Sequence, residues 1–557
     1  MIEKMNQYDA VIIGFGKGGK TMAGALGAAG KKVALIERSS MMYGGTCINV
    51  GCIPTKSLVY RAGLAFAKGG EQNHKADAYR EAMAQKDALT ARLRKKNYDK
   101  LDSSPNITVM DGTASFVSPH VVEVVNGEER FRVEGELIFI NTGSSAFVPP
   151  IEGLKDNPYV YTSEGLLNRR ELPEKLVIIG GGYIGVEFSS IYASFGSEVT
   201  ILQDGDVFLP REDAEIAGEV KKSLEARGVR VLTGVKTKAV RQGQGKAIVD
   251  LEGKEGPLEL QADAVLVATG RRPNTKDLNL KAAGVEVNAR GGIITDDSLR
   301  TTAPHIYAMG DVRGGLQFTY ISLDDFRIVK SSVLGDGSYD LKKRGAVPYS
   351  VFLNPPFSRV GMGEKEALEA GYKVKVAKLT AASIPKAQVL EQQQGTALVG
   401  GIIGHGDDSP VGDLFQRGGF AGVDAHGLVV DGAGVHQVGV VFCVIGLHVS
   451  DVLEEVSVIL PFLHSNVGGE IVGVRDNLQG DALGGQGVHD LLQNLLVGGR
   501  GGANPQGNRF AGCLSLRGVF IGGVLSGGAA AGGQAQAQGQ RHGQCKKLLH
   551  GMGSSLK

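Results

Sequence analysis

The chain has few cysteines, almost no net charge and no long apolar run. Only two of its five cysteines are close in sequence, which fits a reducing compartment such as the cytoplasm rather than a secreted disulfide framework. The formal net charge of +1 gives no electrostatic footprint for nucleic acid or an acidic membrane. The most apolar stretch, residues 427–450, is interrupted by Asp431, His436 and five glycines, so no membrane helix is expected. A strand is expected within the first eight residues, which leaves no room for a signal peptide.

The most informative segment that is present is Gly44–Lys56, which contains the two close cysteines. Four residues separate Cys47 from Cys52, and Pro54 fits the first position of a helix. A disulfide near a helix N-terminus is easily reduced, because the helix stabilises the thiolate that forms. The pair is interpreted as a redox-active disulfide, and a buried structural pair is the alternative.

A dinucleotide fingerprint precedes this segment. Gly14, Gly16 and Gly19 follow an apolar run at residues 8–13, which predicts a buried parallel strand. Gly14 permits the tight turn, Gly16 lets the backbone approach a pyrophosphate, and Gly19 lets the following helix, expected at 20–30, pack close to the strand. Glu37, after a second predicted strand at 32–36, is placed to bind a ribose.

A second fingerprint consists of Gly180, Gly182 and Gly185. It follows an apolar strand at 175–179 and precedes a helix and another strand at 198–202. Two dinucleotide sites and one redox disulfide together suggest an electron relay from nicotinamide through flavin to the disulfide.

With these motifs the chain resembles the class I pyridine nucleotide–disulfide oxidoreductases, the group of glutathione reductase, lipoamide dehydrogenase and mercuric reductase. Within the group it is most similar to the bacterial reactive-chlorine-resistance oxidoreductases. The resemblance runs from about residue 8 to about residue 391, and its most specific motifs are residues 44–56, 209–213, 314–325 and 347–352. It implies an α/β fold with two Rossmann-like dinucleotide-binding domains and the start of an α+β dimerisation domain. It also implies FAD as cofactor and a homodimer.

The resemblance assigns roles to the reactive residues. Cys47 is expected to be the interchange thiol that meets the substrate, and Cys52 the charge-transfer thiolate beside the flavin. Lys56 is expected to pair with Glu187 close to the reactive flavin nitrogen, where a cation favours the charge of the reduced flavin. Tyr183 is expected to cover the flavin until nicotinamide displaces it. No resident metal site is expected.

Further cofactor contacts are implied by motif position. The turn at Thr142–Ser144 returns from the flavin domain, Ala114 offers a backbone contact to the adenine, and Asp311 accepts hydrogen bonds from the ribityl chain. The complete set of expected cofactor contacts beyond the two fingerprints is Glu37, Thr46, Lys56, Ala114, Thr142, Gly143, Ser144, Tyr183, Gln203, Gly270, Asp311, Gln317, Phe318 and Thr319.

The choice of nicotinamide rests on the end of the strand at 198–202. Gln203 stands where a carboxylate would bind a free ribose and repel a 2′-phosphate. No arginine pair replaces it, and Asp204 and Asp206 make the loop acidic, so NADH is favoured and NADPH remains possible.

The expected domain order is a flavin domain at 1–149 and 275–345, a nicotinamide domain at 150–274 and the beginning of an interface domain at 346–390. A charged, Ala-rich stretch at 75–101 predicts a long exposed helix, whose basic cluster at 92–96 is a solvated face.

The final third, residues 391–557, is atypical. It contains 38 of the 83 glycines, no tyrosine and only three lysines. Neither the helical nor the strand period persists over much of it. The family's closing His-Pro-x-x-x-Glu motif, which supplies an acid/base histidine, is absent from it. The segment is interpreted as out-of-frame coding, and a real Gly-rich domain is the alternative.

The principal functional hypothesis is an FAD-containing oxidoreductase that oxidises NAD(P)H. Its disulfide would reduce a small oxidant, a disulfide or a metal ion in oxidative-stress defence, since thiolates are apt ligands for soft metal ions. The alternative is a flavin-binding module that has lost turnover together with its interface domain.

Overall fold

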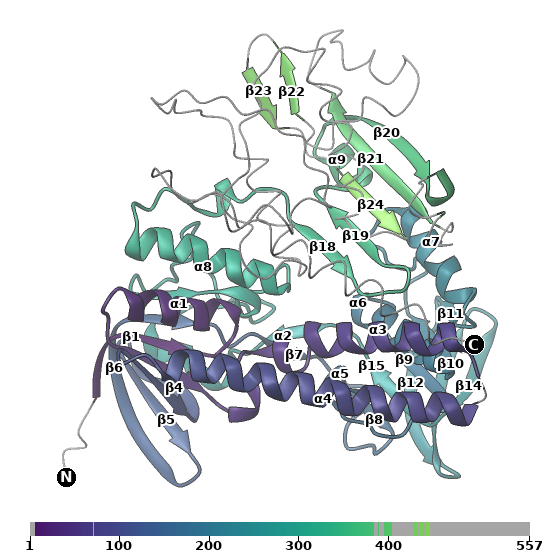
Figure 1. The fold of residues 1–557 in the computed structure, drawn as a ribbon, viewed down its shortest axis with the longest axis horizontal. Helices are drawn as coiled ribbons and strands as arrows, with labels where there is room; N and C mark the ends of the chain where they lie inside the picture. Colours follow the sequence, from purple (N-terminus) through teal and green to yellow (C-terminus); the bar gives the residue numbers. More distant parts are fainter. Residues whose placement is uncertain are drawn as a thin grey trace, which may run out of the picture. The chain divides into compact units, whose positions relative to one another are not determined.

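The computed structural model describes residues 6–70, 72–383, 388, 395–403, 428–431, 434–437 and 441–445. Within them the chain builds the same α/β plan twice and then an antiparallel sheet (Figure 1). The two predicted Rossmann-like domains are thereby confirmed.

The first sheet has seven strands around a parallel centre. Its parallel strands are β1 (Asn6–Ile13), β2 (Val33–Glu37), β3 (Ile107–Asp111), β6 (Glu129–Ile140) and β17 (Ile306–Ala308), and β4 (Thr113–Ser118) and β5 (Val121–Asn126) add an antiparallel edge. All five residues of β2 are buried, as expected for a parallel strand covered on both faces. On one side α1 (Lys17–Ala28) packs against α8 (Thr319–Leu334) (Figure 1).

The second sheet is entirely parallel, in the order β11 (Arg230–Thr233), β10 (Glu198–Gln203), β9 (Lys175–Ile179), β15 (Ala264–Val267) and β8 (Val160–Tyr161). Its helices are α5 (Ser163–Leu166), α6 (Tyr183–Phe195) and α7 (Ala214–Glu225), and an antiparallel meander of β12 (Lys236–Gly243), β13 (Lys246–Gly253) and β14 (Gly256–Ala262) accompanies it. Because β7 (Ser144–Ala146) pairs with β16 (Arg271–Pro273), the chain enters and leaves this second unit at adjacent points.

The third sheet is antiparallel, in the order β18 (Pro348–Val351), β19 (Phe357–Val360), β24 (Val441–Ile445), β21 (Thr396–Ile403) and β20 (Lys373–Thr380), with α9 (Glu364–Glu369) beside β20. A hairpin joins β22 (Leu428–Asp431) to β23 (Gly434–Gln437). We call the five-stranded sheet the interface sheet.

The interface sheet departs from the sequence expectation in one respect. Strands β21 and β24, like the β22–β23 hairpin, come from the segment interpreted as atypical, in which neither the helical nor the strand period persists over much of the sequence. β21 contains Gly400 and Gly401, which lower its intrinsic strand preference, whereas the Val, Phe and Ile residues of β24 favour a strand. The other residues of the segment 391–557 lie outside the described residues.

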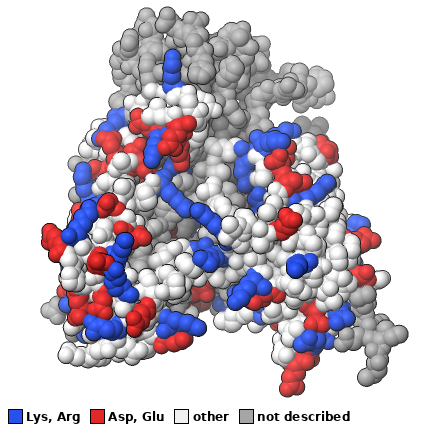
Figure 2. Space-filling model, turned by 180° about the vertical axis from the view of Figure 1, so that it is seen from behind, with Lys and Arg blue, Asp and Glu red and all other residues white. Residues whose placement is uncertain are grey.

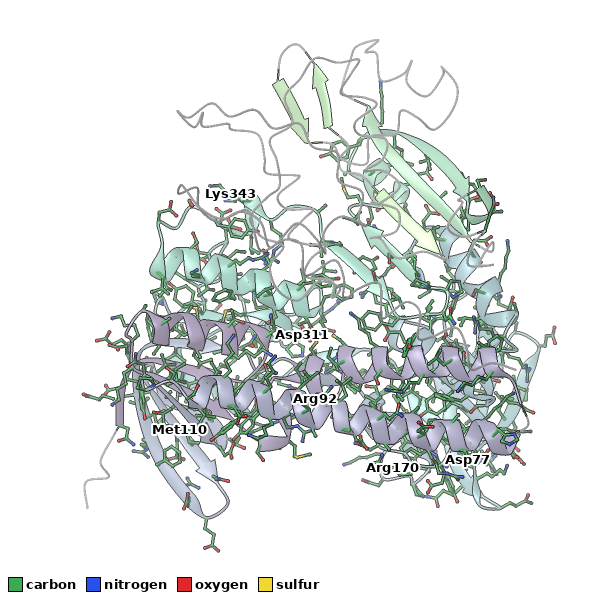
Figure 3. The ribbon with its side chains drawn as sticks, in the orientation of Figure 1. Asp77, Arg92, Met110, Arg170, Asp311 and Lys343 are labelled. Atoms are coloured by element: carbon green, nitrogen blue, oxygen red, sulfur yellow. The ribbon has the colours of Figure 1, made fainter. Side chains whose placement is uncertain are left out.

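Three helices join the first two units. After α2 (Thr46–Asn49), the long helices α3 (Cys52–Lys68) and α4 (Gln72–Asp102) pack against each other (Figure 1). The prediction that α4 is exposed is wrong for one of its faces, because Tyr79 and Met83 are fully buried. The hydroxyl of Tyr79 donates to the backbone oxygen of Arg169 at 2.8 Å, which ties α4 to the second unit. The opposite face, including Arg92 (Figure 3), is exposed as expected.

The surface carries both signs of charge. On the face that Figure 2 shows, Lys and Arg side chains are interspersed with Asp and Glu. No helix in the described part of the chain combines the length and the apolar character that crossing a bilayer would need.

Candidate functional site

The two close cysteines face each other across a tight loop. Cys47 belongs to α2 and Cys52 is the first residue of α3, and both are half-buried free thiols. Gly45, with φ of +79°, allows the loop to lie against the first fingerprint, since a Cβ there would be 2.6 Å from the Cα of Gly16. The cysteine loop and the first glycine loop are therefore in direct contact.

The pair is arranged so that one thiol ionises before the other. A hydrogen bond from Cys52 lowers the pKa of Cys47 to about 6, with further help from Thr319, Lys20 and Lys56. The same hydrogen bond, together with burial, raises the pKa of Cys52 well above its ordinary value. The contacts within this chain therefore favour a Cys47 thiolate, and the expectation of a Cys52 thiolate beside a flavin stays a prediction.

Thr319 brings a third element to the dithiol. It is the first residue of α8, and its Oγ1 lies 3.2 Å from the Sγ of Cys52. The sequence predicted Thr319 as a cofactor contact, and the structure places it against the sulfur.

Lys20 is a residue that the sequence reasoning missed. Its Nζ donates to Oδ1 of Asn97 at 2.6 Å and to the backbone oxygen of Gly44 at 3.4 Å. Burial lowers the pKa of Lys20 to about 8, while the nearby Cys47 opposes that shift. The sequence signal for this contact was the position of Lys20 directly after Gly19, in the first turn of the helix that begins beside the cysteine loop.

Glu187 is a partly buried acid on α6. Burial raises its pKa to about 7, and the backbone N–H of Phe352 donates to its Oε1 at 2.9 Å. Lys56 attracts the carboxylate, but its Nζ lies over the ring of Phe352, 4.7 Å from the centroid. No ion pair between Lys56 and Glu187 is recorded within the described residues, so their expected pairing stays a prediction.

The first glycine loop has the close approaches that its pattern implies. Gly14 has φ of +104°, and a Cβ on Gly19 would be 2.2 Å from the backbone oxygen of Gly14. Oε2 of Glu37 accepts the N–H of Phe15 at 2.9 Å, and burial raises the pKa of this acid. Glu37 thus fixes the loop with one carboxylate oxygen.

The second glycine loop repeats this arrangement. A Cβ on Gly185 would be 2.1 Å from the backbone oxygen of Gly180, whereas a Cβ on Gly182 would meet open space. Oε1 of Gln203 accepts the N–H of Gly181 at 3.1 Å, the counterpart of the Glu37 contact. Gln203 therefore accepts the same loop N–H contact as Glu37 but carries no charge.

Asp311 is a buried carboxylate between the two halves of the first unit (Figure 3). Burial raises its pKa, and it accepts the hydroxyl of Ser144 at 2.7 Å. The adjoining turn is fixed by Asn274, whose backbone oxygen accepts the Thr142 hydroxyl at 2.8 Å and whose N–H donates to Gly143 at 3.0 Å.

The remaining expected contacts lie at element ends or edges. Ala114 is buried in β4, Thr46 begins α2, and Gly270 has φ of +112° with open space beside it. Gln317 is half-buried and precedes Phe318, the N-cap of α8. Their contacts with a cofactor stay predictions. Among the described residues, no cluster of three or more His, Cys, Asp or Glu side chains is close enough to hold a metal ion.

Comparison with protein families gives two matches. The model described as pyridine nucleotide-disulphide oxidoreductase matches residues 8–325, and the dimerisation domain of the same family matches residues 347–399. The resemblance that the sequence motifs carried is confirmed by these matches.

Known proteins agree with this result. The chain is 49% identical over 391 residues to the probable pyridine nucleotide-disulfide oxidoreductase RclA of Escherichia coli, covering 70% of this chain and 85% of that protein. It is 35% identical over 396 residues to a mercuric reductase of Staphylococcus aureus, covering 70% and 71%. A solved Cu(II) complex of the HOCl-induced flavoprotein disulfide reductase RclA from Escherichia coli is 38% identical with a TM-score of 0.70, covering 89% of this chain and 100% of the other.

Proposed function

The chain belongs to the pyridine nucleotide-disulphide oxidoreductase family, and we propose that it passes electrons from NAD(P)H by way of FAD to the Cys47–Cys52 pair. The observation that carries this proposal is the free dithiol itself. Its two sulfurs share a hydrogen bond, and Thr319 and two lysines assist the ionisation of Cys47. A pair in which one thiol is ionised near neutral pH is suited to thiol–disulfide exchange.

The reaction balances as a two-electron transfer. NAD(P)H gives up a hydride, which carries two electrons and one proton, and becomes NAD(P)⁺. With one further proton from solvent, the Cys47–Cys52 disulfide is reduced to two thiols. FAD, when bound, supplies the relay of the electron pair between nicotinamide and disulfide. Cys47, as the thiol with the lowered pKa, then attacks or binds the acceptor.

The residues present fit these cofactors. Both helices that would face a pyrophosphate, α1 and α6, begin at glycine N-caps, where backbone N–H groups favour an anion. Asp311 is a buried carboxylate with further capacity to accept hydroxyl donors, as a ribityl chain requires. For the nicotinamide we propose NADH, because Gln203 offers no cation to a 2′-phosphate and Asp204 follows it.

The relatives suggest the acceptor. One of them is named a mercuric reductase, and another is described as HOCl-induced and was solved with Cu(II). We propose that this dithiol reduces a soft or redox-active metal ion, or a disulfide, during oxidative stress in the cytoplasm. With Cu(II), two ions would become Cu(I) as the two thiols return to the disulfide and release two protons. The match to a dimerisation domain at 347–399 supports a homodimer.

Two variants test the relay. Under anaerobic conditions NADH should bleach the flavin absorbance of purified protein and produce a long-wavelength band from a thiolate lying against the flavin. Cys52→Ser should abolish that band and keep the flavin bound, whereas Cys47→Ala should keep flavin reduction and lose turnover with the acceptor.

Equal loss of both half-reactions in Cys47→Ala would mean that Cys47 is structural. Bound flavin without any reduction by NADH in the unmodified protein would favour the alternative, a flavin-binding module.

A further inference from the structure

The buried carboxylate of Glu212 accepts a hydrogen bond from Tyr183, the residue that is expected to cover the flavin until nicotinamide displaces it. The side chain of Glu212, in the loop between β10 and α7, is fully buried. Its Oε1 accepts two hydroxyl groups, from Tyr183 at the start of α6 and from Tyr349 on β18, the latter at 2.7 Å. Its Oε2 lies 3.4 Å from Nη1 of Arg359 on β19. One carboxylate thus joins the second unit to the interface sheet.

The ring of Tyr183 also lies beside two other aromatic rings. Its centroid lies 6.3 Å from that of Phe318 and 5.7 Å from that of Tyr349, and Phe318 and Tyr349 stack at 5.1 Å. Phe318 directly precedes Thr319, which contacts the sulfur of Cys52. The ring is therefore fastened at its hydroxyl end and supported by a stack that leads to the dithiol.

We propose that Glu212 is a positioning residue that latches Tyr183 closed, so that nicotinamide binding requires the Tyr183–Glu212 hydrogen bond to break. The proposal rests on the function proposed above, because it needs NAD(P)H to bind where Tyr183 now lies. It adds a connection that the family assignment does not contain, namely that the interface sheet takes part in gating through Tyr349 and Arg359.

The other two contacts of Glu212 limit the free-energy cost of breaking its bond to Tyr183. An unpaired buried carboxylate would be strongly unfavourable. When Tyr183 leaves, the hydroxyl of Tyr349 and the guanidinium of Arg359 remain on Glu212, because both come from the interface sheet and not from α6. Tyr349 thus stabilises the open state, and the hydroxyl of Tyr183 stabilises only the closed one.

The two tyrosines should therefore act in opposite directions. Tyr183→Phe keeps the ring and removes the latch, so the Kd for NAD⁺ should fall by about 3- to 10-fold, the factor that one such hydrogen bond corresponds to. Tyr349→Phe removes the donor that remains after opening, so the Kd should rise by about the same factor. Glu212→Gln removes the negative charge that makes loss of the Tyr183 hydroxyl costly. It should therefore lower the Kd and the KM for NADH, with little change in the rate of acceptor reduction.

The measurement is calorimetric titration of the flavin-loaded protein with NAD⁺ and, separately, NADP⁺, together with KM and kcat for NADH. Tyr192→Phe is the matched control, since its hydroxyl is also buried on α6 but bonds to Leu166 and Tyr79 at 3.2 and 3.0 Å. It should leave the affinity unchanged. An unchanged or raised Kd in Tyr183→Phe, with an unmodified protein that binds NAD⁺ and is reduced by NADH, would overturn the latch alone. An unmodified protein that binds neither nucleotide would overturn the latch and the proposed function together.

Discussion

At the scale of single residues, the chemistry depends on how a few charges surround two sulfurs. Cys47 is ionised near neutral pH because Cys52 donates to it and because Thr319, Lys20 and Lys56 stabilise its charge. Lys20 contributes from inside the protein, where its bond to Asn97 at 2.6 Å fixes the position of its charge. A buried cation held at a fixed place acts more strongly than an exposed one, because water screens it less.

Lys20→Met should make Cys47 less acidic. A thiol whose pKa is about 6 is mostly thiolate at pH 7, and its alkylation rate should fall as the pH drops through 6. Without the Lys20 charge, the midpoint of that pH profile should move upward by about 0.5 to 1 unit. The profile is measured by alkylation of the reduced protein, with the modified Cys47 peptide quantified by mass spectrometry.

The control for this change is Lys95→Met, which removes an exposed lysine that pairs with Asp99 on α4. It should leave the profile where it was. A midpoint that is the same in Lys20→Met and the unmodified protein would show that Lys20 does not act on the thiol.

At the scale of elements, the two nucleotide loops follow the same rule with different residues. In both, the first glycine turns the chain and the last lets the helix approach the strand, so that Gly19 and Gly185 each lie against a backbone oxygen. In both, a long polar side chain at the end of the next strand accepts an N–H from the loop, Glu37 in one and Gln203 in the other. The same loop contact is therefore made by a side chain that can carry a negative charge and by one that cannot.

Two glycines of α1 should respond oppositely to alanine. Gly19→Ala should lower the unfolding midpoint and the flavin content, because its Cβ would be 2.2 Å from the backbone oxygen of Gly14 and the helix must shift. Gly24→Ala should stabilise the protein by about 0.5–1 kcal/mol, because its Cβ meets only Leu101 at 3.8 Å and alanine loses less entropy in a helix. Thermal unfolding and flavin absorbance of the purified variants measure both effects. Equal stability of the two variants would contradict this account of Gly19.

At the scale of the whole molecule, the interface sheet buries apolar residues that follow residue 346. Val351 and Phe357 are 1% and 0% exposed, and Leu398 of β21 joins the same core. Strands β21 and β24 lie between β19 and β20 in the sheet order, so the sheet is continuous only when they are present. The beginning of the interface domain at 346–390 therefore depends on residues beyond 391.

Two truncations test this dependence. A chain that ends after residue 390 should lose β21 and β24, expose Val351 and Phe357, and bind a hydrophobic dye more strongly. A chain that ends after residue 446 should keep both strands and bind no more dye than the full chain. Dye fluorescence and sedimentation measure the two outcomes. If the shorter chain were as monodisperse and dye-free as the longer one, the interface sheet would not need its central strands.

The features that could be predicted from the sequence are those that are local in the chain. The strand–glycine–helix units and the Gly44–Lys56 segment each lie within a few tens of residues, and their backbone requirements allow few alternatives. This sufficed for the two Rossmann-like domains, the family and the cysteine pair. The same reasoning did not find β21 and β24. β21 contains two glycines and carries no clear period, and β24 is a short apolar run that periodicity alone does not assign to a strand or a buried helix.

The distant residues that surround these motifs could be identified only from the folded chain. Thr319 lies 267 positions from Cys52, and Tyr349 lies 137 positions from Glu212, so no spacing rule could connect them. Lys20 and Asn97 meet because α1 and α4 pack beside the same loop, and one face of α4 is buried because the second unit lies against it. A motif fixes the backbone that a cofactor needs. The charges and hydroxyls that tune its chemistry come from whichever elements the fold brings to it.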